Sequence, residues 1–465
     1  MIGHELVFNY FGLLEDAFRE LALFAAVGYL IGGIDDILID AIWLFRSGLR
    51  RLASPLNPNP LTSDRLPQRA DPGRFAVFVP AWDESAVIGP MLDNALCAYA
   101  NDQVHIFVGC YPNDPLTIEI VRRRAGPRLS LIVHERDGKT TKANCLNMLF
   151  AALRLHEAAT TRRFSGIVLH DAEDVVSPHE MRVFDMMVDR FGMIQLPVVP
   201  LPDAKSRWIG GHYCDEFAES HGKTQIVRQA LGAALPGAGV GCMIRRDVVE
   251  AMALETGGQP FAEASLTEDY ELGLRLGELG FKSAFVRVDD RKRFGVVATQ
   301  AHFPATLAAA VQQKARWMIG IGLAGWDRLG WGHGWAENWM RLRDRKGVLA
   351  AVVAVAGYLA ATLGCLLLLA QYLIGTPPLL FGETLGILIW INGWLLLWRL
   401  GVRAGFVVSV YGWREGCWAI PRTVVSNVIA IMAARRAVFH YLSMRRSGRV
   451  EWDKTAHKFP DSVGQ

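Results

Sequence analysis

The sequence predicts an α/β protein in which a mostly parallel β-sheet is joined to transmembrane and interfacial helices. Between about residues 74 and 300, short β-rich runs alternate with helical stretches, which is typical of parallel sheets with helices on both faces. Two later runs, residues 348–374 and 379–400, are apolar enough and long enough to cross a bilayer. Hydrophobic residues make up 51% of the chain and the mean hydropathy is +0.19, more apolar than an ordinary soluble enzyme.

The first element is an apolar stretch over residues 21–45, interrupted only by Asp35, Asp36 and Asp40. We predict an N-terminal transmembrane helix, domain 1–46, whose three carboxylates face protein or the membrane interface, because they are costly in lipid. The alternative is a buried amphipathic helix. Residues 1–20 are acidic rather than basic, so they do not form a cleavable signal peptide.

The central block, residues 47–346, is predicted to hold the sheet. We expect strands at 75–79, 105–109, 129–133, 166–169, 193–196 and 283–288. Helices are expected at 86–100, 116–124, 141–156, 178–190, 268–279 and 305–321. Ligands of such sheets bind beyond the carboxyl ends of the strands, which is where the polar motifs lie.

The two later apolar runs form a predicted transmembrane hairpin, domain 347–400, connected by Thr376-Pro377-Pro378. Arginines and lysines follow the first span, precede the second and follow the third, which indicates that these three ends face the cytoplasm. The scheme gives an outside N-terminus and an inside central block. In residues 404–444 two apolar stretches are interrupted by Arg414, Glu415, Pro421 and Arg422. Domain 401–465 is therefore expected to hold interfacial helices and a cytoplasmic tail.

Charge and cysteine content argue against a nucleic-acid partner, a disulfide framework and a zinc site. The net charge is only +3, so no global field favours nucleic acid. The seven cysteines are odd in number and contain no C-x-x-C pair, which indicates reduced thiols rather than a disulfide framework or a zinc site.

An acidic cluster follows the fourth strand: Asp171, Glu173 and Asp174. Carboxylate oxygens suit hard cations such as Mg²⁺ or Mn²⁺. Alternate residues of an extended chain point the same way, so Asp171 and Glu173 can share one ion. The alternative is an acidic turn that caps the helix beginning near Pro178.

Two further motifs follow. Thr267-Glu268-Asp269 opens a helix, and the alternative to a catalytic role is a helix start in which Thr267 caps and the acids complement the dipole. Gln313, Arg316 and Trp317 share one helix face, where arginine offers a fork to diphosphate oxygens and tryptophan a stacking surface. Their alternative is an interfacial helix with a tryptophan anchor.

The order Asp-x-Glu-Asp, Thr-Glu-Asp and Gln-x-x-Arg-Trp resembles the family 2 membrane glycosyltransferases, which include cellulose and hyaluronan synthases. The resemblance implies a GT-A-like fold, a nucleotide-sugar donor, and Mg²⁺ or Mn²⁺ held by the acidic cluster. It makes Asp269 the base that activates the acceptor hydroxyl, with Glu268 beside it in the catalytic pair. Gln313, Arg316 and Trp317 would hold the acceptor and the diphosphate.

The donor pocket is inferred from the same resemblance. Pro80-Ala81-Trp82-Asp83-Glu84 resembles the turn that begins the nucleotide pocket, and Lys142-Ala143-Asn144-Cys145-Leu146-Asn147 resembles a phosphate-binding segment. The usual paired aspartates after the second strand are missing, and Tyr111 and Asp114 are the two candidates that take their place. The expected donor residues are Pro80, Asp83, Glu84, Tyr111, Asp114, Lys142 and Asp171. An ordinary solvated lysine is the alternative for Lys142.

Within that family the chain is most similar to the phage-adsorption protein B type of membrane glycosyltransferase. The similarity rests on Gly33-x-Asp35-Asp36, on Tyr111-Pro112-Asn113-Asp114-Pro115, on the acidic cluster and on Trp452-x-Lys454-Thr455-x-His457.

The resemblance implies a bacterial inner-membrane hexosyl- or N-acetylhexosaminyl-transferase that inverts the anomeric centre, prefers a UDP-sugar and elongates an exopolysaccharide. The alternatives are transfer of one sugar to a lipid-linked acceptor, or a non-catalytic part of a surface or phage-receptor complex. Three spans are few for a pore, so the bilayer-embedded protein is expected to need an oligomer or an outer-membrane export partner.

Overall fold

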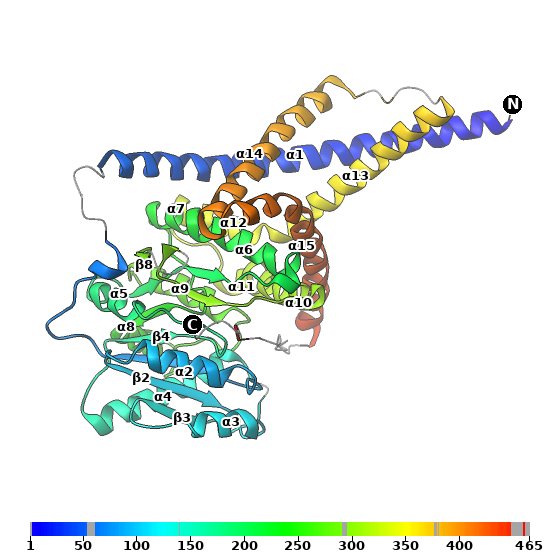
Figure 1. Cartoon of the computed structure of the whole chain (residues 1–465). Coiled ribbons are helices and arrows are strands. Elements are labelled where there is room, and N and C mark those ends of the chain that lie inside the picture. The colour runs from blue at the N-terminus through cyan, green and yellow to red at the C-terminus, as the bar shows by residue number, and fades with distance from the viewer. Residues whose placement is uncertain are drawn as a thin grey trace.

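The computed structural model describes the backbone of residues 2–53, 61–138, 140–290, 295–375, 379, 381–447 and 459–460, and side chains from residue 11 onward. The predicted connection Thr376–Pro378 and the Trp452–His457 motif lie outside the described residues. A sheet domain carries a layer of long helices on one side (Figure 1).

The main sheet has seven strands in the order β3-β2-β1-β4-β7-β5-β8. All six predicted strands are present, and they run parallel to one another. The seventh, β7, was not predicted, and it pairs antiparallel with both β4 and β5. The bounds are β1 Phe75–Pro80, β2 Val104–Cys110, β3 Leu129–Val133, β4 Gly166–Leu169, β5 Met193–Gln195, β7 Cys242–Arg245 and β8 Ser283–Phe285.

Helices cover both faces of this sheet, as the alternation of elements predicts. Alternate residues of β1 show the division: Val77 and Val79 face one apolar core, whereas Ala76 and Phe78 face the other. The first core contains α2 (Ile88–Ala98), α3 (Pro115–Arg122) and α5 (Glu180–Met187). The second contains α4 (Lys142–Thr160), α8 (Arg246–Glu255) and α9 (Glu268–Glu278).

The remaining elements join the sheet domain to the long helices. Two small sheets pair β6 (Val198–Pro200) with β11 (Thr299–Ala301) and β9 (Asp289–Asp290) with β10 (Gly295–Val296). The joining helices are α6 (Ile209–Glu219), α7 (Gln225–Ala230), α10 (Leu307–Trp317), α11 (Ala324–Leu329) and α12 (Trp335–Arg345). Short turns complete them: η2 (Ser63–Arg65), η3 (Ala204–Ser206), and the π-type η4 (Ser220–Thr224) and η5 (Met318–Leu323).

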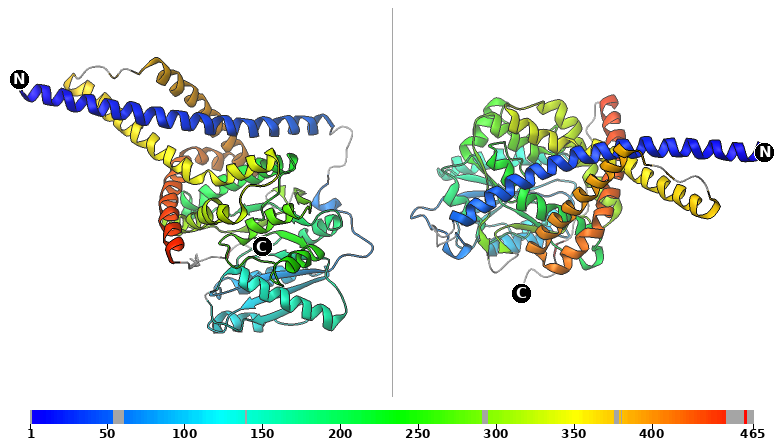
Figure 2. Two further views of the ribbon diagram at one scale, coloured as in Figure 1. Left: turned by 180° about the vertical axis from the view of Figure 1, so that it is seen from behind. Right: turned by 90° about the horizontal axis from the view of Figure 1, so that it is seen from above.

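Four helices of the described residues are long and apolar enough to cross a membrane: α1 (Ile2–Ala53), α13 (Gly347–Ile374), α14 (Glu383–Tyr411) and α15 (Trp413–Ser447). Figure 2 shows α1, α13 and α14 crossing one another above the sheet domain and extending beyond it. At 52 residues α1 is much longer than the roughly 20 residues that a bilayer requires.

The three aspartates in the apolar stretch of α1, Asp35, Asp36 and Asp40, face protein cations, as expected for charges in an apolar helix. Asp35 accepts hydrogen bonds from Lys346 at 2.5 Å and from the Trp339 indole at 2.7 Å, and it pairs with Arg343. The two other acids are held in the same way, Asp36 by Arg343 and Arg399 and Asp40 by Lys223 and Trp398. Salt bridges thus fix α1 to α12, α14 and η4.

Residues 404–444 form longer helices than the interruptions in the sequence suggested. Residues up to Tyr411 continue α14, the chain turns at Gly412 with φ 85°, and α15 then runs unbroken through Pro421. Two of the interrupting charges are paired: Arg422 is buried and donates to Asp215 and Glu415. The position of this segment at the membrane interface stays a prediction. Because α15 packs on α10 and α6 through Ile429, Ala433 and Ala437, the tertiary contacts stabilise this helix.

Candidate active site

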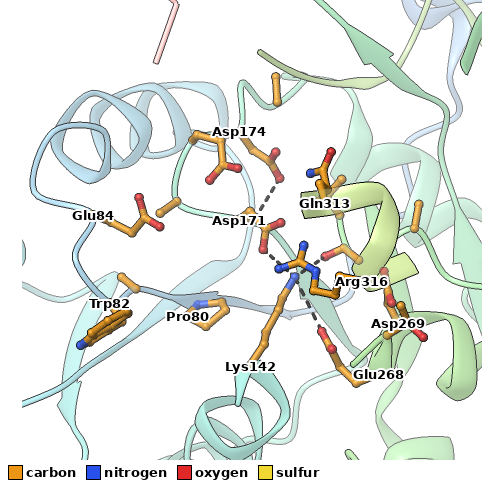
Figure 3. A pocket seen from close by; sticks show the side chains of 18 of the residues that line it. Pro80, Trp82, Glu84, Lys142, Asp171, Asp174, Glu268, Asp269, Gln313 and Arg316 are labelled. Atoms are coloured by element: carbon orange, nitrogen blue, oxygen red, sulfur yellow. Dashed lines mark hydrogen bonds and ion pairs between the residues drawn. The ribbon is translucent and has the colours of Figure 1, made fainter. Parts of the chain in front are cut away.

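One pocket lies where the carboxyl ends of β1, β2 and β4 meet the first turns of α4 and α9 and the side of α10 (Figure 3). This is the edge at which ligands of parallel sheets bind. The structure brings most of the predicted site residues together in its lining. They are Pro80, Glu84, Tyr111, Lys142, Asp171, Glu173, Asp174, Glu268, Asp269, Gln313, Arg316 and Trp317.

Two predicted donor residues, Asp83 and Asp114, do not line the pocket. Asp114 is the N-cap of α3: its carboxylate accepts from Thr117 N at 3.2 Å and from Asp83 N at 2.6 Å. The capping bonds turn this carboxylate away from the pocket. Of the two substitutes considered for the missing aspartates, Tyr111 is the one in the lining, where its hydroxyl meets Thr140 Oγ1 at 2.5 Å.

Lys142 lies at the centre of the pocket, as Figure 3 shows, with dashed lines to carboxylates on either side. Thr141 caps α4, so Lys142 is the first residue of the helix and its side chain reaches into the pocket. Its Nζ is 2.5 Å from Asp171 and 3.9 Å from Glu268. Burial lowers the pKa of Lys142, but the nearby carboxylates outweigh burial and raise it above the ordinary value. The alternative of a solvated lysine is therefore wrong.

Glu268 and Asp269 are the first two residues of α9, and both are held in an apolar, crowded setting. Burial, followed by the charge of Asp269, raises the pKa of Glu268 to about 7. Burial also raises the pKa of Asp269, while Lys142 opposes the shift. Thr267 occupies the N-cap position but makes no side-chain cap, contrary to the capping alternative, and its hydroxyl packs on Gly320. A carboxylate with a raised pKa in a pocket is suited to accept a proton.

A glycine-rich loop that the sequence analysis missed lies against Asp269. A Cβ at Gly239 would meet Asp269 Oδ2 at 2.7 Å and Lys142 Nζ at 3.4 Å, and Gly239 has φ 77°. The neighbouring Gly237 donates its N–H to the Asp269 carbonyl at 3.2 Å, and its own Cβ position is 2.8 Å from that oxygen. The alternation of glycines at 237, 239 and 241 was the signal that could have identified this loop.

A buried network fixes the turn that carries Asp171. His170 is fully buried and lies between Asp174 and Glu180, at 2.9 Å from each. Burial lowers the pKa of His170, but the two carboxylates outweigh burial and raise it to about 10. Asp174 also accepts from Asp171 N at 3.0 Å. Both contacts use Asp174 Oδ2, so this oxygen orders the turn, and the inclusion of Asp174 among the metal ligands stays a prediction.

The other acids of the pocket suit a divalent cation whose coordination a bound ligand would complete. Asp171, Glu173, Glu268 and Asp269 bring carboxyl groups to the pocket, together with the positive charges of Lys142 and Arg316. In the described residues no three His, Cys, Asp or Glu side chains are close enough to hold a metal by themselves. Mg²⁺ commonly takes one or two protein carboxylates together with phosphate oxygens and water. Asp171 and Glu173 suit that arrangement.

The α10 side of the pocket combines polar and aromatic groups. Gln313, Arg316 and Trp317 all reach the lining, and Gln313 Oε1 is buried without a hydrogen-bond partner among the described residues. Phe303 and Phe217, which the sequence analysis did not select, line the pocket beside Trp317, with their rings 4.9 Å apart. This wall offers flat apolar surfaces beside an acceptor atom, which suits a sugar ring.

Comparison with known proteins agrees with this geometry. Residues 72–320 match a family model described as "Glycosyltransferase like family 2". The chain is 36% identical over 469 residues to bacteriophage adsorption protein B of Escherichia coli strain K12, and equally to the corresponding protein of Escherichia coli O157:H7. The match covers 96% of this chain and 63% of each relative, so the chain spans less than two thirds of their length.

A solved structure shows the same fold. The mannosyltransferase of Pyrobaculum calidifontis, determined in complex with GDP-Man and Mn²⁺, superposes with a TM-score of 0.52. The superposition covers 92% of this chain and 99% of that one, at 16% sequence identity. The chain therefore has a GT-A-like fold, as the sequence motifs implied.

Proposed function

Because the chain belongs to glycosyltransferase family 2, we propose that it transfers a sugar from a nucleotide diphosphate donor with inversion at the anomeric carbon. One observation carries the proposal: Asp269, a carboxylate with a raised pKa, shares a pocket with Asp171 and Glu173, which suit a cation. The basic side chains of Lys142 and Arg316 line the same pocket. Inverting transfer requires such a base opposite a stabilised leaving group.

Each residue receives a role from its position. Asp269 takes the proton of the acceptor hydroxyl as that oxygen attacks the anomeric carbon. Arg316 and Lys142 line the same pocket, with Lys142 paired to Asp171, and they offset charge on the departing diphosphate. Asp171 and Glu173 would hold Mg²⁺ or Mn²⁺, which neutralises diphosphate charge when bound.

The donor is proposed to be a UDP- or GDP-sugar. The sequence resemblance favours UDP, whereas the solved structure with the same fold holds GDP-Man and Mn²⁺. Tyr111 lines the pocket in the place where family members carry the paired aspartates, so it is our candidate for contact with the base. The remaining donor contacts are proposed for Pro80 and Glu84.

We propose a growing polysaccharide as the acceptor, held by Gln313, Trp317 and the aromatic wall. Transfer of one sugar to a lipid-linked acceptor is the second candidate. Trp317→Ala separates the two: loss of a stacking surface, on the order of 1 kcal/mol, should shorten the products of a polymerase more than it slows donor turnover. An enzyme that transfers a single sugar would give one product size with tryptophan or with alanine at position 317.

The proposed location is the bacterial inner membrane, with the sheet domain in the cytoplasm and α1, α13 and α14 in the bilayer. The four candidate spans support membrane attachment. The relatives are named for bacteriophage adsorption, so a role in a surface complex with an export partner or a second copy of the chain belongs to the proposal as well.

The test uses the full chain in nanodiscs with a panel of UDP- and GDP-sugars and either Mg²⁺ or Mn²⁺. We expect release of the nucleoside diphosphate, loss of release in EDTA, and loss of transfer in Asp269→Asn with donor binding retained. Asp189→Asn, an exposed surface acid, is the matched control. Full turnover in EDTA, or equal loss of donor affinity and turnover in Asp269→Asn, would contradict the assigned roles.

A further inference from the structure

Arg345, the last residue of α12, is a buried cation without a hydrogen-bond partner. Its exposed fraction is 5%, and in the described part of the chain none of its three guanidinium nitrogens, Nε, Nη1 and Nη2, has an acceptor. One turn earlier, Arg341 is equally buried but donates to Glu337, Glu278 and the Leu329 carbonyl. Buried charges are normally paired, as Arg341 is. The lack of acceptors around Arg345 therefore indicates a site that binds an anion.

Two tryptophans enclose this guanidinium. The rings of Trp326 and Trp331 each lie 5.2 Å from Arg345 Cζ. Aromatic faces stabilise the charge but accept none of its N–H groups. Trp331 is 48% exposed and lies in the loop Gly330–Gly334, where Gly330 and Gly334 have positive φ values of 53° and 87°. Displacement of this one side chain would uncover the edge of the guanidinium.

The site lies where the sheet domain meets the apolar helices. Arg345 precedes the first residue of α13, Gly347, by two positions. Trp326, Trp331 and Trp335 are 41%, 48% and 70% exposed in this same segment. Exposed tryptophans next to an apolar helix are typical of the headgroup layer of a membrane, in which phosphate is the abundant anion.

We propose that Arg345, which packs against Trp326 and is covered by Trp331, binds the phosphate of an anionic glycerophospholipid headgroup. The headgroup displaces Trp331 toward the bilayer, and two phosphate oxygens accept the guanidinium N–H groups in a bidentate pair. The inference goes beyond the proposed transfer reaction and rests only on the proposal that α13 crosses the membrane.

The site is connected to the helix that carries the proposed base. Asp344, the neighbour of Arg345, accepts a hydrogen bond from Tyr270 at 2.8 Å, and Tyr270 directly follows Asp269. The same segment holds α9 at two more points, through Arg328 to Glu271 at 3.0 Å and through Arg341 to Glu278 at 2.7 Å. Side chains of this segment that contact α9 therefore connect a lipid bound at Arg345 to that helix.

The test compares melting temperature and bound lipid, neither of which needs turnover. The full chain is purified in dodecylmaltoside and measured alone, with phosphatidylglycerol, and with inorganic phosphate. We expect Arg345→Met to melt at the same or a higher temperature than the native chain in detergent alone, because it removes an unpaired buried charge. Phosphatidylglycerol should raise the melting temperature of the native chain more than that of Arg345→Met, and native mass spectrometry should show one fewer retained lipid in the variant.

Two further variants keep the result interpretable. Arg341→Met removes a fully paired arginine from the same helix and should melt at a lower temperature with or without lipid. Trp331→Ala keeps the charge and removes its cover, so it should retain the lipid. Equal stabilisation of the native chain and Arg345→Met by phosphatidylglycerol overturns the proposal, as does a lower melting temperature of Arg345→Met in detergent alone. Stabilisation by inorganic phosphate equal to that by lipid overturns the headgroup as the source.

Discussion

The acid pair at the start of α9 is governed by its immediate neighbours. Glu268 and Asp269 are adjacent, Glu268 is buried and Asp269 half-buried, and both are close to a single ammonium, that of Lys142. Two interacting carboxylates titrate as a pair, and removal of one charge makes the other easier to ionise. The proposed base therefore depends on Glu268 even though Glu268 need not touch the acceptor.

This gives a prediction for pH dependence. The base works only when it is deprotonated, and the pKa values of Glu268, about 7, and of Asp269 are both raised. Because burial raises the pKa of Asp269, transfer by the native chain should fall as the pH drops, over a range above that of an ordinary aspartate. Glu268→Gln removes the neighbouring negative charge, lowers the pKa of Asp269 and should move this acid limb to lower pH. Profiles of kcat/KM against pH measure the shift, and an unmoved limb would show that the limb belongs to another group.

Gly239 provides a second test at the level of one residue. Gly239→Ala places a Cβ against Asp269 and Lys142 and also strains a φ of 77°, whereas Gly232→Ala strains a φ of 74° with nothing within 4 Å of the new atom. The backbone strain, about 1–2 kcal/mol, should be similar in both. We expect both variants to melt at lower temperature, but only Gly239→Ala to lower kcat, by tenfold or more, with little change in donor KM. Equal kinetics in the two variants would remove the loop from the positioning of the base.

The structure brings the residues of all three motifs into one pocket, because each motif follows a strand end, opens a helix or lies on a helix beside it. Their roles stay predictions. The position of Asp114 could not be predicted from the sequence: it is an acid near the right strand, but backbone N–H groups of Thr117 and Asp83 bind both of its oxygens and it lies outside the lining.

At the scale of elements, the segment that precedes α13 contacts α9 near both of its ends. Tyr270, Glu271 and Glu278 contact Asp344, Arg328 and Arg341. The sheet side of α9 packs through Leu272 and Leu276, so the polar contacts determine how the helix turns about that apolar face. Asp269 lies on the first turn, where a small rotation moves its carboxylate most.

Tyr270→Phe tests this clamp. The change removes one hydroxyl that donates to Asp344 and leaves the ring in place. A hydrogen bond to a charged group contributes roughly 1.5–3 kcal/mol, so we expect a several-fold loss of kcat with unchanged donor KM. Tyr441→Phe is the matched control, because Tyr441 also donates to an aspartate, Asp327, but at an exposed position outside the pocket lining. If both variants lose kcat equally, the clamp does not act on the base.

Most strands of the sheet could be predicted, and the exception has a physical explanation. Alternation of β-rich runs and helices located six strands of the main sheet, and β1, β2, β3 and β4 are each followed by their own helix. Strand β7 differs in direction: it lies antiparallel between β4 and β5 and leads directly into α8. Its short run, Cys242-Met243-Ile244, gives a weak periodic signal, and only the partners on both sides determine its conformation.

At the scale of the molecule, the chain divides into a sheet domain and three helices that project beyond it, with α15 along the side of the domain (Figures 1 and 2). Hydropathy alone does not distinguish α15 from the other three long helices. Its contacts do: Arg422 pairs with Asp215, and Ser426 donates to Glu216 at 3.2 Å, both on α6. These two contacts lie one turn apart near the start of α15, and Ile429, Ala433 and Ala437 continue the packing of the helix on the sheet domain.

These contacts predict the topology of α15. Passage of α15 through a bilayer would separate Arg422 from Asp215 and leave a buried charge unpaired, which is strongly unfavourable. In a background without the exposed Cys97, Cys365 and Cys417, single cysteines should replace Phe439 on α15, Leu155 on α4 and Tyr372 near the end of α13. We expect a membrane-impermeant thiol reagent to label positions 439 and 155 only in inside-out vesicles and position 372 only in right-side-out vesicles. Labelling of position 439 together with 372 would mean that α15 crosses the membrane, and the contacts with α6 would then belong to a different arrangement of the chain.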